Sequence, residues 1–362
     1  MRDSPVLYAL MAFFCASVLT LVLTPVVRKL ANSIGAVDIP RDERRMHRNA
    51  VPLLGGIAIF AGVTLTSFFF CEVNLRLLLG SAGGLLVCLI GFADDLFDLN
   101  PYLKLAGEFA AAAVVLPCFR IEHFELFGNY LSLGVLSVPV TLLWIVGLTN
   151  AFNLIDGLDG LACGVSVICS LSLTYVAARH ADYPVVLMAV ILCGACLGFL
   201  PFNIQPAKIF MGDTGALYLG YLLSLLSIAG TFKTTAAISF LIPILLFGYP
   251  LFDTLFSFFR RIVKGKNPFQ ADKGHLHHRM VALGLTVNQT VLLLYAVCSL
   301  LGILAIELSE HRTAAFLIIL VLAVLAGILN YLYVRGKKEK EESNQPDRTD
   351  KEEPSDREDS DE

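Results

Sequence analysis

Acidic side chains stand directly at the ends of long apolar runs in this sequence. The adjacent pair Asp94 and Asp95 ends one run in the segment GFADDLFD, and Asp213 precedes another in FMGDTG. Carboxylates at the edge of an apolar span are costly unless they are paired, hydrated or bound to a cation. Mg²⁺ is usually held by one or two carboxylates together with substrate phosphates, so a magnesium site is one interpretation. The alternatives are a solvated helix end at Asp94 and Asp95, and a helix cap formed by Asp213 and Thr214.

A second polar motif, NAFNLIDGLDGL, places an amide or a carboxylate at every third position. The four side chains are Asn150, Asn153, Asp156 and Asp159. On a continuous α-helix this spacing would spread them over about half of the circumference. Gly157 and Gly160 indicate instead that the helix ends inside the motif, so that the polar groups face one cleft. Such groups suit hydrogen bonds to a nucleobase or ribose and metal ligation, and a simple Asn/Asp/Gly turn is the alternative.

A histidine-rich segment follows a basic stretch late in the sequence. Its members are His275, His277, His278 and Arg279. They can contact phosphate groups. Zinc is a competing interpretation, but no cysteines accompany them and the other acids suit Mg²⁺, and a plain surface loop is a third. Two further groups have two interpretations each. Lys104 either pairs with Glu108 four residues later or meets a lipid phosphate, and Asp253 either pairs with a loop arginine or serves the site.

Apolar runs long enough to cross a bilayer position these groups. Hydrophobic residues make up 56% of the 362 residues and charged residues only 16%, against roughly 25% charged residues in soluble domains. We predict an all-α polytopic integral membrane protein with about 11 transmembrane helices. The expected spans are residues 5–27, 52–70, 77–93, 103–117, 135–152, 161–177, 185–201, 216–230, 236–259, 290–308 and 313–334.

Basic residues lie mainly on one side of these predicted spans. That side carries 14 Lys and Arg residues, most of them in residues 28–48 and 260–279, whereas the opposite side carries six. Cytoplasmic loops are enriched in Lys and Arg, so we expect the N-terminus outside and the C-terminus inside. The candidate site residues then all belong to the cytoplasmic side.

The chain is expected to form one transmembrane domain followed by a tail. The domain comprises residues 1–335 and the tail residues 336–362. Residues 337–362 hold 12 acidic and six basic side chains. A segment this polar and charged cannot bury enough apolar surface to fold, so we predict a disordered, acidic cytoplasmic tail.

Five motifs, taken in order, resemble those of the polyprenyl-phosphate N-acetylhexosamine-1-phosphate transferases. They lie between residues 28 and 280 and read MHRNAVPLLGGIAIF, GFADDLFDLNPYLKL, NAFNLIDGLDGLACG, KIFMGDTGALYLGY and DKGHLHHRM. The resemblance implies an enzyme of the bacterial cytoplasmic (inner) membrane that attaches a sugar-1-phosphate to undecaprenyl phosphate and releases UMP. It implies Mg²⁺ as cofactor, with Mn²⁺ as an alternative. The expected partners are a UDP-N-acetylhexosamine, undecaprenyl phosphate and membrane lipids; no nucleic acid is expected, and a homodimer is left open.

The residue patterns and the resemblance together give three sets of site residues. The catalytic set is Asp94, Asp95, His277 and His278. The metal-binding set is Asp213, Asp156 and Asn153. The substrate-binding set is Lys104, Asn150, Asn153, Asp159, His275 and Arg279.

The segment HLHHR resembles the branch that transfers GlcNAc-1-phosphate and starts a lipid-linked cell-envelope glycan such as lipopolysaccharide or teichoic acid. Leu276 interrupts the three consecutive histidines usual in phospho-MurNAc-pentapeptide transferases of peptidoglycan synthesis, the alternative within the family. A membrane transporter is the alternative from another class. Transporters place their sites near the bilayer midplane, often within inverted repeats, whereas these acids lie at one edge. Direct attack by the lipid phosphate and a covalent aspartyl-phosphate route both stay open.

Overall fold

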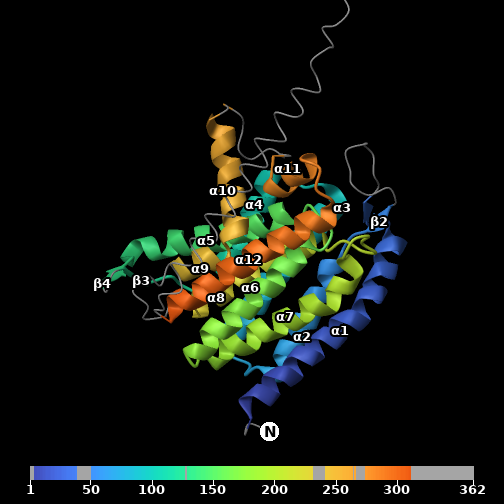
Figure 1. The fold of residues 1–362 in the computed structure, drawn as a ribbon. Helices are drawn as coiled ribbons and strands as arrows, with labels where there is room; N and C mark the ends of the chain where they lie inside the picture. The colour runs from blue at the N-terminus through green and yellow to red at the C-terminus, as the bar shows by residue number, and fades with distance from the viewer. Residues whose placement is uncertain are drawn as a thin grey trace, which may run out of the picture. The chain divides into compact units, whose positions relative to one another are not determined.

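Helices make up most of the structure, a computed structural model shown in Figure 1. It describes residues 4–38, 50–126, 129–230, 241–263, 265 and 274–310, all within one unit, Met1–Ile319. The helices of this part are α1 (Pro5–Ile34), α2 (Gly55–Phe70), α3 (Leu75–Phe97), α4 (Pro101–Val115), α5 (Ser137–Ile155), α6 (Leu161–Arg179), α7 (Tyr183–Asn203), α8 (Gly212–Gly230), α9 (Leu241–Leu246), α10 (Gly248–Val263), α11 (Leu276–Ala282) and α12 (Val287–Ser309).

These helices coincide with ten of the predicted spans, although the ninth is divided between α9 and α10. The eleventh, residues 313–334, lies outside the described residues, as do the tail at residues 336–362 and the first residues of two of the quoted motifs. Within the described part, six helices are long and apolar enough to cross a membrane: α1, α3, α5 with the turn before it, α6, α7 and α12. The chain is therefore a largely helical, multi-pass membrane protein.

Two short strand pairs depart from the all-α prediction. β1 (Val37–Asp38) pairs antiparallel with β2 (Val51–Pro52), and β3 (His123–Leu126) pairs antiparallel with β4 (Asn129–Ser132). A 3-10 turn, Gly134–Leu136, precedes α5. Both pairs lie in connections between helices, where backbone N–H and C=O groups that leave a helix need new partners.

Small residues let the helices approach closely, as is typical of helix packing in membranes. On α7, a Cβ added at Gly194 or Gly198 would lie 2.3 Å from the Phe13 carbonyl oxygen or 2.2 Å from that of Ser17, both on α1. Helix α1 buries Ala12 and several other small residues on this side, while its large apolar side chains face outward. Figure 1 shows α1 beside α7 and α2.

Helix α8 lies at the centre of this packing, and nearly all of its residues are buried. Its first turn touches two neighbouring backbones. A Cβ at Gly56 of α2 would lie 2.1 Å from the Gly215 nitrogen, and one at Gly91 of α3 would lie 2.5 Å from the Thr214 nitrogen. The start of α8 is therefore fixed by direct backbone contact with α2 and α3.

Candidate functional site

Lys104, in the first turn of α4, joins carboxylates from two other helices. Its Nζ lies 2.8 Å from an Asp94 oxygen at the end of α3, and it also forms an ion pair with Asp213 at the start of α8. The Leu99 backbone N–H donates to the second Asp94 oxygen at 2.7 Å. Lys104 thus pairs with two carboxylates from other helices and not with Glu108, while its contact with a lipid phosphate stays a prediction.

Asp95 caps the N-terminus of α8 from the neighbouring helix α3. Its carboxylate accepts hydrogen bonds from the backbone nitrogens of Asp213 and Thr214 at 2.8 and 3.1 Å, and from the Thr214 hydroxyl at 2.7 Å. Gly212 has φ +68° and leaves no space for a Cβ, which would lie 2.5 Å from an Asp95 oxygen. The cap predicted from Asp213 and Thr214 is therefore supplied by Asp95, whose negative charge also suits the positive end of the helix dipole.

The predicted helix end inside the NAFNLIDGLDGL motif is confirmed. Helix α5 ends at Ile155, and Gly160, with φ +79°, begins the turn into α6. Before that end, the Asn150 amide donates to Glu108 of α4 and, at 3.0 Å, to the Val146 carbonyl. Asn150 is therefore held by the buried acid Glu108, which is 2% exposed.

The remaining members of this motif divide between a loop contact and the site. Asp159 accepts a hydrogen bond from the Ala207 backbone N–H at 2.9 Å, which ties the turn after α5 to the connection before α8. Among the described residues, the buried Asn153 amide nitrogen has no hydrogen-bond partner. Burial, followed by the negative charges of Asp213, Asp95 and Asp159, raises the pKa of Asp156 well above its ordinary value. Asp156 therefore lies in the same negative field as the carboxylates of α3 and α8.

Asp253 on α10 anchors the histidine segment. One of its oxygens lies 2.9 Å from His275 Nδ1, and the other accepts the Leu276 backbone N–H at 2.7 Å. Asp253 and His275 are 1% and 4% exposed. Asp253 thus holds the residue just before α11 and the first residue of that helix. Of the two interpretations of Asp253, the contact is made with a histidine of the segment and not with an arginine.

Helix α11 brings His277 against the turn that follows α5. A Cβ added at Gly157 would lie only 2.3 Å from His277 Nε2. His277 is buried, and this burial, with a smaller effect of His278, lowers its pKa to about 3. Its imidazole is therefore neutral at pH 7 and can make hydrogen bonds but does not contribute a positive charge.

The other two residues of the histidine segment lie beside aromatic rings. The His278 ring centroid is 4.3 Å from that of His277. The Arg279 guanidinium carbon lies 5.7 Å from the centroid of the Phe256 ring on α10. Arg279 therefore brings a permanent positive charge to this segment.

These carboxylates suit a divalent cation in chemical type. Asp94 and Asp213 share the Lys104 ammonium, and the charges of Asp213 and Asp95 act on Asp156. In the described part of the chain, no three His, Cys, Asp or Glu side chains stand together as a complete metal-binding group. Mg²⁺ commonly takes only one or two carboxylates and completes its shell with water and substrate phosphates. The residues present therefore fit Mg²⁺ if the phosphates of a bound substrate supply the remaining oxygen ligands.

Segments far apart in the sequence thus meet at one end of the helices. The end of α3, the start of α4 and the start of α8 are joined by Lys104 and Asp95, and the turn after α5 touches α11. Figure 1 shows α11 at the end of the structure opposite the N-terminus. Every predicted site residue lies in these segments or in the helix turns next to them. The contact of Asp253 with His275 agrees with the interpretation that Asp253 serves the site, whereas the contact of Glu108 with Asn150 is an addition that the sequence does not assign.

Comparison with known proteins shows the family of this chain. The family model described as glycosyl transferase family 4 matches residues 77–231, from the first turn of α3 to the end of α8. The chain is 38% identical to a probable undecaprenyl-phosphate N-acetylglucosaminyl 1-phosphate transferase of Bacillus subtilis, over 86% of this chain and 87% of the relative. It is 35% identical to a decaprenyl-phosphate N-acetylglucosaminephosphotransferase of Mycolicibacterium smegmatis, over 77% of each chain. It is 28% identical to the undecaprenyl-phosphate alpha-N-acetylglucosaminyl 1-phosphate transferase of Escherichia coli K12, over 83% of each. The chain therefore belongs to the polyprenyl-phosphate N-acetylhexosamine-1-phosphate transferases of glycosyl transferase family 4.

Proposed function

We propose that this protein transfers GlcNAc-1-phosphate from UDP-GlcNAc to undecaprenyl phosphate and releases UMP. The observation that carries the proposal is the meeting of the carboxylates of α3, α8 and the turn after α5 with Lys104 and the histidine helix α11 at one end of apolar helices. A lipid phosphate is confined to the membrane interface, and a nucleotide sugar reaches it from water. A polar site at the ends of membrane helices is where these two substrates can meet.

The site is proposed to face the cytoplasm of a bacterium, at its inner membrane. The basic residues in residues 28–48 and 260–279 support this orientation through the positive-inside rule, with the N-terminus on the outer side. Nucleotide sugars are made in the cytoplasm, so the orientation agrees with the proposed donor.

The proposed reaction is a phosphoryl transfer between two anions. An oxygen of the lipid phosphate forms a bond to the β-phosphorus of the donor, the bond from that phosphorus to the bridging oxygen breaks, and UMP leaves with the electron pair. The second pKa of a phosphate monoester is about 6, so the acceptor is largely dianionic at pH 7 and needs little help from a base. Positioning and neutralising the two anions is therefore the main task of the protein.

The contacts of each residue indicate how it would help to position or neutralise the two anionic substrates. Mg²⁺ would be held by Asp213 with Asp94 and Asp156 nearby, and when bound it would neutralise charge on the pyrophosphate. Asp95 is less suited to be a ligand, because both of its oxygens cap α8. Lys104 and Arg279 supply positive charge, and the neutral His277 can hydrogen bond to an oxygen of the donor.

The test is UMP release from radiolabelled UDP-GlcNAc by the purified full chain, with undecaprenyl phosphate and Mg²⁺ in detergent. We expect release that requires both the lipid and the divalent cation and that falls at least a hundredfold in Asp213→Asn. Glu310→Gln is the matched control, because Glu310 pairs with Arg179 at 2.9 Å where α6 and α12 end, away from the site. UDP-GalNAc and UDP-MurNAc-pentapeptide are tested in parallel. Turnover of only the pentapeptide donor, or no lipid-dependent UMP, would contradict the proposal.

A further inference from the structure

A cavity lies at the end of the helices opposite the carboxylate site. Its volume is about 460 Å³, within the range of small-molecule pockets. It is enclosed by the start of α1, the end of α2, the starts of α3 and α7, and the end of α8. On α3, Leu77 lines the cavity while Asp94 belongs to the site. At 1.5 Å per residue, the two positions are about 25 Å apart along the helix, so the cavity lies near the other membrane interface.

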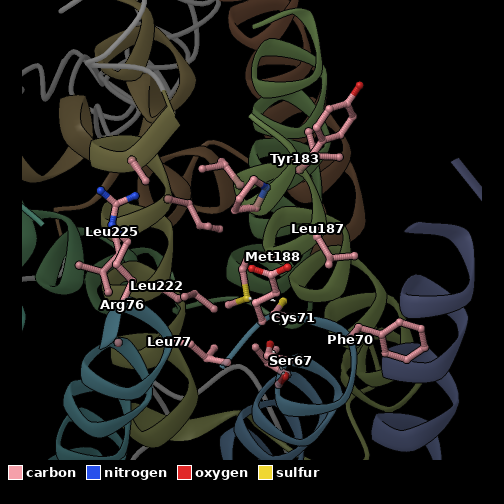
Figure 2. Close-up of a pocket in the computed structure, with 18 of the residues that line it drawn as sticks. Ser67, Phe70, Cys71, Arg76, Leu77, Tyr183, Leu187, Met188, Leu222 and Leu225 are labelled. Atoms are coloured by element: carbon pink, nitrogen blue, oxygen red, sulfur yellow. Dashed lines mark hydrogen bonds between the residues drawn. The ribbon is translucent and has the colours of Figure 1, made fainter. Parts of the chain in front are cut away.

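The lining of the cavity is mostly apolar, and two of its hydroxyl groups already have hydrogen-bond partners. Figure 2 shows Met188, Cys71 and Ser67 around a shared space, with Leu77 and Leu222 close by. The Ser67 hydroxyl donates to the Val63 carbonyl at 2.7 Å. The Tyr8 hydroxyl donates to the Phe70 carbonyl, also at 2.7 Å. Water needs two to four polar partners to stay in a buried space, so an apolar chain suits this cavity better.

Charged side chains of both signs line the mouth. Arg76 and Glu72 are exposed, and Asp182 is half-buried. Arg76 lies in the first turn of α3, where the positive end of the helix dipole also favours an anion. Two carboxylates and one guanidinium in the lining of the same cavity favour a head group that carries both a phosphate and an ammonium over one that is only anionic.

We propose that this cavity binds a zwitterionic glycerophospholipid, with an acyl chain in the apolar space, the phosphate at Arg76 and the amine at Glu72 and Asp182. Such a lipid would tie together the ends of five helices that come from distant parts of the sequence. This inference does not depend on the transferase activity, because the cavity and the carboxylates lie at opposite ends of α3 and α8.

Native mass spectrometry of the purified full chain tests the proposal, after equilibration with equal amounts of phosphatidylethanolamine and phosphatidylglycerol. We expect one retained phosphatidylethanolamine. Gly80→Leu should reduce the retained lipid at least fivefold. A Cβ added at Gly80 would lie 3.8 Å from Leu225 and 4.0 Å from Phe119, and both of these residues line the cavity. A leucine side chain at this position would therefore fit without a clash at its Cβ and would occupy part of the cavity. Arg76→Ala should reduce it about threefold. Since Arg76 is on the surface, this variant tests the proposal even if Gly80→Leu does not fold.

Two matched controls are available. Gly147 lies on the outer face of α5 with nothing within 4 Å of an added Cβ, and Arg120 is exposed and does not line the cavity. Gly147→Leu and Arg120→Ala should therefore keep the lipid. Equal retention of phosphatidylglycerol, displacement by added undecaprenyl phosphate, or unchanged retention in Arg76→Ala would each overturn the proposal.

Discussion

Replacing Asp95 by alanine is expected to destabilise the protein, whereas replacing its neighbour Asp94 is expected mainly to remove activity. The two carboxylates differ in their partners. Asp95 accepts three hydrogen bonds from the first turn of α8. Asp94 accepts from Lys104 and from the Leu99 backbone N–H near the site.

The magnitude follows from the bonds that each change breaks. Loss of a helix cap costs about 0.5–2 kcal/mol. Loss of a hydroxyl bond to a charged acceptor costs about 1.5–3 kcal/mol. These contributions overlap in one carboxylate, so we expect Asp95→Ala to lower the free energy of unfolding by about 3 kcal/mol, roughly a hundredfold in the folding equilibrium. Asp94→Ala should cost only about 1 kcal/mol, because Lys104 keeps its ion pair with Asp213.

The assay compares unfolding and transfer in the same preparations. Both variants are unfolded by titration with SDS in mixed micelles, and UMP release is measured under conditions in which each is folded. Asp95→Asn should be intermediate, because the amide keeps one of the two accepting oxygens. The reasoning would be refuted if Asp95→Ala unfolded at the same SDS concentration as the wild type, or if Asp94→Ala lost as much stability as Asp95→Ala.

Three further predictions concern the rest of the site. Asp253→Ala and His275→Ala should each reduce transfer, and the double variant should lose no more than Asp253→Ala alone, because the two side chains act as one contact; additive losses would contradict this. Lys104→Gln should abolish transfer yet bind Mn²⁺ more tightly in an EPR titration, since no ammonium then competes for Asp94 and Asp213; weaker binding would count against it. The pKa of His277 falls from 6.5 to about 3 on folding, so the unfolded chain binds more protons between these values and stability falls as the pH falls through them. At pH 5 this loss is about 2 kcal/mol relative to pH 7, measured as a shift in unfolding that His277→Asn should remove.

Local features of the site could be predicted from the sequence. The end of α5 at Ile155 agrees with the glycines that follow it, because Gly160 adopts positive φ in the turn before α6, a conformation that glycine reaches without strain. The spans follow from apolar runs whose length matches the bilayer. Such signals need no knowledge of the neighbouring helices.

Contacts between distant segments could not be predicted in this way. The cap of α8 comes from Asp95, 118 residues before Asp213, although Asp213 and Thr214 are themselves ordinary capping residues. The partners of Lys104 are not Glu108, four residues away, but Asp94, 10 residues away, and Asp213, 109 residues away. The i, i+4 rule considers only partners on the same helix. The packing of different helices decides which of several carboxylates a lysine can reach.

The glycine contacts of α2 and α3 with the first turn of α8 also bear on how substrates enter. The first turn of α8, which carries Asp213, packs directly against the main chain of α2 and α3. Main chain cannot adjust its position by changing rotamers. The opposite wall, α11, is held to α10 by side chains, through Asp253 with Leu276 and Arg260 with the Gly274 carbonyl. We therefore expect α11 to move when a bulky nucleotide sugar binds, while the first turn of α8 with Asp213 keeps its position.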